Sequence, residues 1–495
     1  MNHSLPITSR HPKALSPSGL RPEQAPEWID AIDNPYLHGL FAPTISEITV
    51  TDLEVEGEIP RDLNGAYFRN GPNNRFAPTN RYHWFDGDGM VHGIWFEDGH
   101  ARYRNRWIDT KGSLLEQERG AGIWPGVLGP FDFDLPHGPL KDTANTDLLS
   151  LRGKLAALWY ESGQLYTLDP NTLESVGVED FNGALKRTIS AHSKTCPQTG
   201  DFVYFGYRDR PPYMWYGVAR ADGSFHQTDI TIPGPRRPHD IGITENYSVL
   251  HDFPVFFDPD FFARTGKRVP LFHRDVPTRY GVIPRFGTDQ DVRWFEFDPC
   301  YMLHVVNCWE EGDWVVMTGC RTDDPTLRPD REDGRLAAML SGLKLQANLY
   351  EWRMNLHTGE SSERKVDDLN AEFPMIAAGW TGRKNRFSYH QIIPWEIPAT
   401  FHGINKYNLE TGTSTQYHYG EGVYGSESPF APRDGSVGED DGYLLSFVTD
   451  VSDWSSACII LDASDVAAGP LATIKIPHRM PAGFHATWMG AHELG

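Results

Sequence analysis

The stretch FVYFGY (202–207) decides the fold class of this chain. Its side chains are the aromatic and β-branched types that are enriched in β-strands. Similar runs, WVVMT at 314–318 and LLSFV at 444–448, recur much further along the sequence. A short apolar run of this composition, bounded by turn residues, is typical of a strand rather than a helix. The three stretches therefore predict β-strands in widely separated parts of the chain.

Turn residues punctuate such runs from about residue 46 onward. The chain holds 47 glycines and 37 prolines, which supply the backbone conformations of tight turns. Turn-forming pairs between the runs are Asp98-Gly99, Pro170-Asn171, Asp222-Gly223 and Thr358-Gly359. Outside about residues 334–346, which predict a short amphipathic helix, helical periodicity is scarce. This pattern indicates an all-β fold.

The domain organisation follows from where this pattern begins and ends. Residues 1–45 are rich in proline, serine and histidine and lack strand or helix periodicity, so we expect an extended amino-terminal arm. No flexible linker divides residues 46–495. A β-sandwich needs far fewer residues, whereas a propeller of four-stranded blades accommodates this many strands and leaves a central axis for a site. We therefore expect a single closed β domain over residues 46–495, and the choice of a β-propeller rests partly on the resemblance described below.

The composition excludes several classes of function. Hydrophobic residues make up 39% and charged residues 23% of the 495 residues, as in ordinary globular proteins. The formal net charge of -22 repels nucleic acids and anionic lipids, so we expect no nucleic-acid partner and at most transient membrane contact. The five cysteines form no C-x-x-C pair, and the amino terminus lacks the apolar core of a signal peptide. We expect a cytoplasmic protein.

Four of the 20 histidines stand out by their setting. Each of the four lies within or at the end of a short apolar segment: His192, His239, His304 and His485. A buried imidazole is costly unless its nitrogens are satisfied, and a metal satisfies one while the other donates to a carboxylate or carbonyl. Hydrogen bonding between strands would satisfy them equally well, and their spacing forms no local metal motif. The residues alone leave both interpretations open.

The sequence also resembles a known protein family. The motifs that carry this resemblance, in chain order, are FRNGPNNRF (68–76), FDGDGMVHGIWF (85–96), ARYRNRW (101–107), DTANTD (142–147), PHDIGITENY (238–247), HVVNCWEEGD (304–313), AEFP (371–374), GSESPFAPRDGSVGEDDGYLLS (425–446) and GFHATW (483–488). In this order they resemble the carotenoid cleavage oxygenases over nearly the whole chain. The resemblance implies a seven-bladed β-propeller, capped by loops and short helices, with Fe(II) on its axis.

The resemblance also implies roles for individual residues. The Fe(II) ligands would be His192, His239, His304 and His485, and three outer glutamates would accept their distal N–H groups: Glu161, Glu372 and Glu427. Thr146 would lie near the iron, where its methyl group limits the vacant positions. Imidazole donors would also accept other divalent metals, so the choice of iron rests on the resemblance. No haem, flavin or nicotinamide site is expected.

One departure from the family pattern affects Glu161. The strand before it, GKLAALWYE, is one residue longer than usual. Side chains alternate along a strand, so an uncompensated extra residue would turn Glu161 away from the metal. We expect a β-bulge to restore its side chain to His239.

The implied reaction is cleavage of a conjugated C=C bond by O2 into two carbonyl products. We favour an apocarotenoid substrate; the alternative is a hydroxylated aryl-alkene of the stilbene, isoeugenol or vinyl-phenol type. Ranked below these are an isomerase and a metal-free propeller that acts as a binding module. The expected substrate contacts are Phe85, Tyr103, Trp159, Tyr160 and Phe484. Tyr103 also has an expected catalytic role, because stilbene-cleaving members pair a tyrosine with a lysine at the phenol, but Tyr160 replaces that lysine.

The stretch GAGIWPGVLGPF (120–131) is the remaining apolar segment with a candidate role. It could form a lip through which a lipophilic substrate enters, or simply a loop packed over the propeller. The sequence supports both interpretations equally.

Overall fold

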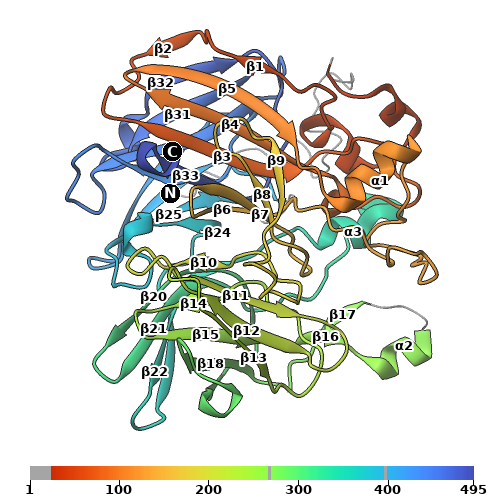
Figure 1. The fold of residues 1–495 in the computed structure, drawn as a ribbon, viewed down its shortest axis with the longest axis vertical. Coiled ribbons are helices and arrows are strands. Elements are labelled where there is room, and N and C mark those ends of the chain that lie inside the picture. The colour runs from red at the N-terminus through yellow and green to blue at the C-terminus, as the bar shows by residue number, and fades with distance from the viewer. Residues whose placement is uncertain (1–23, 266–268, 395–398) are drawn as a thin grey trace.

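The computed structural model describes residues 24–265, 269–394 and 399–495. These residues form seven β-sheets arranged as the blades of a propeller, with a few short helices (Figure 1). The predicted all-β propeller is confirmed. The runs quoted above lie in strands: β11 (Phe202–Tyr207), β21 (Trp314–Thr322) and β30 (Gly442–Asp450).

Five of the blades are four-stranded antiparallel sheets built from consecutive segments. Blade 2 holds β6 (Asp147–Leu151), β7 (Lys154–Leu158), β8 (Tyr166–Leu168) and β9 (Ser175–Val178). Blade 3 holds β10 (Lys194–Thr195), β11, β12 (Met214–Ala219) and β13 (Phe225–Ile230). Blade 4 holds β14 (Gly242–Ile243), β15 (Tyr247–Asp252), β18 (Thr278–Pro284) and β19 (Arg293–Phe297). Blade 5 holds β20 (Tyr301–Glu311), β21, β22 (Asn348–Asn355) and β23 (Ser361–Lys365). Blade 6 holds β24 (Ala371–Met375), β25 (Phe387–Ile392), β26 (Gly403–Asn408) and β27 (Thr413–His418).

The other two blades combine the two ends of the chain. Blade 1 joins β1 (Thr49–Val50), β3 (Gly65–Pro72), β4 (Gly89–Glu97) and β5 (His100–Trp107) to the carboxyl-terminal β33 (Ala486–Gly490). Blade 7 joins β2 (Val55–Gly57) to β28 (Val423–Tyr424), β29 (Phe430–Pro432), β30, β31 (Ser456–Asp462) and β32 (Pro470–Ile476). Figure 1 shows the red and orange amino-terminal strands beside the blue carboxyl-terminal ones. This exchange of strands closes the propeller and leaves fewer open sheet edges.

The hydrophobic core lies between neighbouring blades. One apolar cluster packs blade 1 against blade 7, and others join blades 2 and 3, 3 and 4, and 4 and 5. Each central strand therefore buries both faces, and every residue of β11 is buried. This explains why FVYFGY is continuously apolar instead of alternating. Outer strands such as β27 face solvent and are polar.

A cap of loops and short helices covers one end of the propeller. Its helices are α1 (Lys111–Arg119), α2 (Pro259–Thr265), α3 (Ala337–Ser341) and the 3₁₀ turns η2 (Glu27–Ala31), η3 (Pro35–Leu37), η4 (Gly39–Phe41), η5 (Trp84–Asp86) and η7 (Arg331–Leu336). A small hairpin, β16 (Val255–Phe257) and β17 (Pro270–Phe272), lies beside α2. Among the described residues no helix is both long and apolar enough to span a bilayer.

The four remaining 3₁₀ turns lie within or between blades. They are η6 (Asp289–Asp291), η8 (Ala378–Trp380), η9 (Val466–Ala468) and η10 (Ala491–Glu493).

Two expectations about these elements differ from the structure. The helix predicted over 334–346 is only five residues long, α3, because Gly334 has a positive φ of 57° and Gly342 ends it. Residues 24–45 of the expected extended arm instead form 3₁₀ turns that bury Tyr36, Leu37 and Phe41 in the cap. The prediction of an extended arm rested on the proline-rich first half and did not account for the apolar residues of the second half. Residues 1–23 lie outside the described part.

Candidate metal centre

The four predicted histidines meet on the propeller axis. His304 lies in β20, and the other three precede the inner strands β10, β14 and β33 of three further blades: His192, His239 and His485. One side-chain nitrogen from each lies within 4.8 Å of the others, a spacing that suits a shared metal ion. Inner strands from distant parts of the chain converge in a propeller, which explains the lack of local spacing between these residues.

Hydrogen bonds orient two of these rings. His304 Nδ1 lies 2.5 Å from Glu372 Oε2, and His485 Nδ1 lies 3.0 Å from Glu427 Oε1. Each carboxylate accepts the Nδ1 proton, which leaves Nε2 with a lone pair. Nε2 of His304, like Nε2 of His192, is buried without a hydrogen-bond partner. Buried imidazole nitrogens that lack partners, face one another and have fixed tautomers fit a divalent metal ion.

The backbone next to the quartet is strained at two residues. His192 has a φ of 65° and Phe373, which follows Glu372, has a φ of 52°. Such values are unusual for residues other than glycine, and they persist only where surrounding contacts enforce them. The N–H of His192 donates to Asp147 Oδ2 at 3.0 Å, and the N–H of Phe373 donates to Glu372 Oε2 at 2.5 Å. The same carboxylates that face the quartet therefore hold these strained conformations.

The charges around the quartet also favour a cation. Burial lowers the pKa of His192, His239 and His304 well below the usual value, so these imidazoles are neutral near pH 7, as ligands must be. Burial also lowers the pKa of His485, but the carboxylates of Glu427, Asp147 and Glu372 together outweigh burial, so the pKa of His485 is raised. Burial raises the pKa of Glu372 to about 8, because little positive charge compensates its carboxylate. A divalent cation would supply that charge.

The predicted role of Glu161 is not what the structure shows. Glu161 Oε2 pairs with Arg237 Nη1 at 2.5 Å, and no hydrogen bond joins Glu161 to His239 among the described residues. β6 and β7 pair without a register shift from Asp147–Leu158 to Leu151–Lys154, so this part of the strand pair contains no bulge. β7 ends at Leu158, and Glu161 lies in the turn that follows, so strand alternation does not set the direction of its side chain, which pairs with Arg237.

Asp147 is the third carboxylate at the quartet, and the sequence analysis missed it. Its Oδ2 lies 3.6 Å from His192 Nδ1 and also accepts the backbone N–H of His192. Asp147 could have been recognised from its place in the motif DTANTD, where it directly follows Thr146 and begins the inner strand β6.

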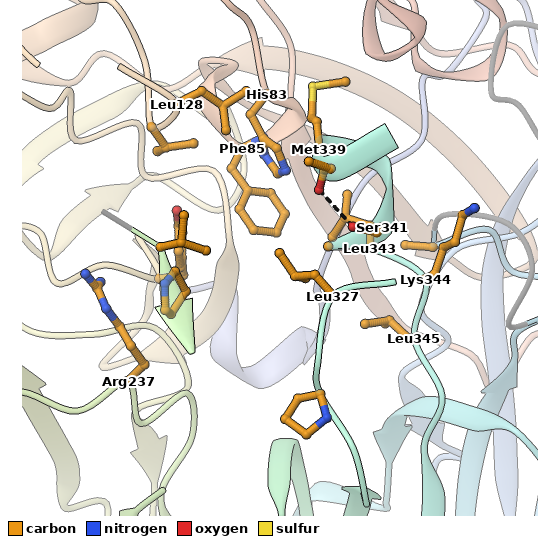
Figure 2. A pocket seen from close by; sticks show the side chains of 18 of the residues that line it. His83, Phe85, Leu128, Arg237, Leu327, Met339, Ser341, Leu343, Lys344 and Leu345 are labelled. Carbon is orange, nitrogen blue, oxygen red and sulfur yellow. Dashed lines mark hydrogen bonds between the residues drawn. The ribbon is translucent and has the colours of Figure 1, made fainter. Parts of the chain in front are cut away.

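A large, mainly apolar cavity of about 2260 Å³ has three of the four quartet histidines in its wall, His239, His304 and His485. Figure 2 shows part of its lining, including Phe85, Leu128 and Arg237. Three of the expected substrate contacts line it, Phe85, Tyr160 and Phe484, as does Thr146. Phe85 lies in η5, where its N–H donates to His83 Nδ1 at 3.1 Å. Its ring centroid is 4.9 Å from that of Tyr160 and 5.3 Å from that of Phe484. These aromatic rings form one wall of the cavity.

The apolar stretch 120–131 contributes to the mouth of this cavity. Val127, Leu128, Pro130 and Phe131 line it, together with the strongly exposed Phe133. Leu327, Leu343 and Leu345 form much of the opposite side in Figure 2.

Two expected substrate contacts are wrong. Trp159 faces a separate small cavity beside Trp124 and does not line the large one. Tyr103 is fully buried in β5, within the core between blades 1 and 7, and its hydroxyl lies 2.7 Å from His92 Nδ1. Tyr103 therefore cannot take the catalytic or phenol-binding role. Tyr103 instead packs in the core beside blade 1, which is the most common role of a tyrosine in a strand.

Replacing Tyr103 by phenylalanine should reduce stability without changing substrate choice. The substitution leaves the buried His92 Nδ1 without its partner, so the free energy of unfolding should fall by about 1–3 kcal/mol. Urea unfolding measures that change, and turnover of an apocarotenal and a vinyl phenol measures substrate choice. Selective loss of vinyl-phenol turnover would show that Tyr103 reaches the substrate after all.

Four histidines that could hold a metal ion thus converge on the axis of a seven-bladed propeller, beside a large apolar cavity. This arrangement defines the class of the protein as a β-propeller with a candidate axial metal site. The family model described as retinal pigment epithelial membrane protein (RPE65) matches residues 41–490. The chain therefore belongs to this family, the carotenoid cleavage oxygenases.

Three relatives illustrate the similarity. The carotenoid 9,10(9',10')-cleavage dioxygenase of Crocus sativus is 37% identical, over 93% of this chain and 90% of that protein. The isoeugenol monooxygenase of Pseudomonas nitroreducens is 30% identical, over 92% of this chain and 98% of that protein. The crystal structure of Pseudomonas brassicacearum lignostilbene dioxygenase superposes with a TM-score of 0.81 at 28% identity, covering 92% of this chain and 99% of that one.

Proposed function

We propose that this protein is an Fe(II)-dependent oxygenase that uses O2 to cleave a conjugated C=C bond into two carbonyl products. The observation that carries the proposal is the convergence of four histidines, two of which have a buried Nε2 atom without a partner, beside a large apolar cavity. His192, His239, His304 and His485 would hold the ion, with Glu372, Glu427 and Asp147 balancing its charge. When bound, Fe(II) supplies the activation of O2.

The chain's own residues would position the alkene and keep water away from it. Phe85 and Phe484 present apolar faces beside the quartet, so one double bond can rest there without exposing polar groups. Thr146 Oγ1 donates to Asn145 Oδ1 at 3.1 Å and accepts the N–H of Tyr160 at 3.2 Å. Because both bonds hold the hydroxyl, the methyl group remains to face the cavity and limit access to the ion. One O2 per alkene balances the two carbonyl products, with electrons from the alkene.

The favoured substrate is an apocarotenoid. The cavity volume of about 2260 Å³ exceeds the range of roughly 300–1,000 Å³ that is usual for small ligands, which suits a long polyene. The dioxygenase of Crocus sativus, which is named for the cleavage of a carotenoid, supports the same choice.

A hydroxylated aryl-alkene is the second candidate. It is favoured by the polar residues Tyr160 and Arg237 in the cavity wall and by the relative named isoeugenol monooxygenase.

Oxygen dependence and product analysis test the proposal. Fe(II)-loaded protein is incubated with apocarotenals, hydroxystilbenes and vinyl phenols, in air and without oxygen, and the carbonyl products are identified by mass spectrometry. We expect two carbonyl fragments from one substrate class, only in air and with O2 consumed. Conversion of substrate without oxygen consumption would indicate an isomerase, and binding without conversion in either atmosphere would indicate a binding module.

A further inference from the structure

Two arginines are buried where the two ends of the chain meet. We call this region the closing seam: β3 and β4 of blade 1, residues 42–44 and residues 478–483 (Figure 1). Arg69 lies in β3, and Arg479 lies between β32 and β33. Their exposed fractions are 3% and 2%, and neither residue lines the large cavity. Two guanidinium groups are therefore enclosed away from both the solvent and that cavity.

Neither guanidinium has an anionic partner among the described residues. Nη2 of Arg479 donates to the carbonyls of Ala42 and Pro43, at 2.6 and 3.0 Å, while its Nε and Nη1 are buried without a partner. Nε of Arg69 is also buried without a partner. Burial lowers the pKa of both arginines, to about 9 for Arg479, and no aspartate or glutamate of the described chain opposes this shift. Both remain positively charged near pH 7, and a buried charge without a counter-ion is costly.

Two histidines of the closing seam provide further N–H donors. His92 stands opposite Arg69 in the pairing of β3 with β4, and its Nδ1 lies 2.7 Å from the hydroxyl of Tyr103. In the tautomer in which Nδ1 accepts from that hydroxyl, Nε2 carries the proton and can donate. Nε2 of His478 lies 3.0 Å from Oγ1 of Thr44, and its Nδ1 is buried without a partner.

These four side chains lie close enough for their charges to act on one another. Burial lowers the pKa of His92 well below its usual value, and positive charge at Arg69, His478 and Arg479 lowers it further. Met480, which follows Arg479, packs in the apolar cluster between blades 1 and 7. The closing seam therefore gathers N–H donors and positive charge in apolar surroundings, without a carboxylate to balance them.

We propose that the closing seam binds one chloride ion between Arg69 and Arg479, with His92 as a further N–H donor. A halide accepts several N–H bonds and needs no donor in return, which matches a set made up of donors. Because the region is enclosed, it favours a small ion over phosphate or an organic carboxylate. The negative charge offsets that of the two guanidinium groups, whose desolvation is otherwise uncompensated.

The ion would stabilise the closure of the propeller. Arg479 holds residues 42–43 through its Nη2 bonds, and Arg69 packs against the segment that leads to His485. That packing is close, since a Cβ atom at Gly483 would lie only 2.7 Å from Nε of Arg69. An ion that fixes both guanidinium groups would therefore join the amino-terminal arm, blade 1 and this segment. Its effect should appear in thermal stability.

Bromide diffraction and salt-dependent unfolding test the anion site. Crystals of the whole protein soaked in sodium bromide should give an anomalous peak between Arg69 and Arg479. The melting temperature Tm should rise by about 2–4 °C as chloride replaces gluconate at constant ionic strength, because an ion that binds only the folded state stabilises it. Gluconate is too large for the enclosed region. Arg479→Met should remove both the peak and the dependence of Tm on chloride.

Arg321→Met is the matched control. Arg321 is buried in blade 5, but it pairs with Glu363 at 2.7 Å, so its loss should lower Tm equally in both salts. The wild-type measurements decide the matter even if Arg479→Met does not fold. No bromide peak at the closing seam would overturn the proposal. A peak without any dependence of Tm on chloride would indicate an adventitious ion only, and would overturn it as well.

Discussion

Replacing His304 by alanine should abolish both metal binding and turnover. Nε2 of His304 is buried without a partner and faces the other three imidazoles, so the substitution removes one of four donors from a closed site. The wild type should hold about one Fe(II) per chain, and the loss of affinity should exceed the roughly 10–100-fold effect of removing an outer partner. His239→Ala and His485→Ala should behave in the same way. Elemental analysis of purified protein gives iron per chain, and product analysis gives turnover.

The control for this experiment is His418→Ala. His418 is exposed on the outer strand β27, and within the described part of the chain its Nε2 forms a hydrogen bond only with Gln416 Oε1, at 3.1 Å. Its iron content and turnover should match the wild type. If replacing all four quartet histidines left the iron content unchanged, the metal site would lie elsewhere.

The sequence predicted the strands well because propeller blades are buried on both faces. FVYFGY and WVVMT are continuous apolar runs, and each lies within a strand whose neighbours cover it from two sides. The closure of the propeller was harder to predict from the sequence, because β33 pairs with β3 and β2 pairs with β32, strands that lie at opposite ends of the chain. No local pattern encodes such pairings. The family resemblance supplied the blade number.

The helices were harder to predict. α1 was not expected, because its polar sequence KGSLLEQER shows little amphipathic spacing. Its ends did carry signals: Thr110 caps its first turn by accepting from Ser113 N–H, and Gly120 ends it with a φ of 71°. Such capping pairs are weak evidence until a helix between them is already suspected.

Motif matching predicted the positions of most residues of the candidate site, but not of all of them. The four histidines, Glu372 and Glu427 occupy the positions that their motifs implied, since each motif fixes its residue relative to an inner strand. Glu161 does not, because it lies in the turn after β7 and its side chain pairs with Arg237. Tyr103 fails for another reason. Which face of β5 points to a neighbouring blade depends on tertiary packing that the motif ARYRNRW does not contain.

Glu372→Gln and Glu427→Gln should weaken iron binding by about 10–100-fold, whereas Glu161→Gln should leave it unchanged. An uncharged amide oxygen is a weaker acceptor for the distal N–H of the ligand, so the ring is held less firmly and donates less strongly to the ion. Glu372 receives His304 Nδ1 at 2.5 Å and Glu427 receives His485 Nδ1 at 3.0 Å, but Glu161 faces Arg237.

The decisive measurement is the iron affinity of each variant, obtained by competition with a chelator of known affinity. Glu310→Gln serves as the matched control, because Glu310 binds Thr244 and Asn246 away from the quartet. Thermal unfolding of the metal-free proteins separates a weakened site from a damaged fold. Glu161→Gln should keep the iron affinity of the wild type. A loss of affinity for Glu161→Gln as large as for Glu372→Gln would instead place Glu161 at His239 once the metal is bound, and Arg237 would then be only its alternative partner.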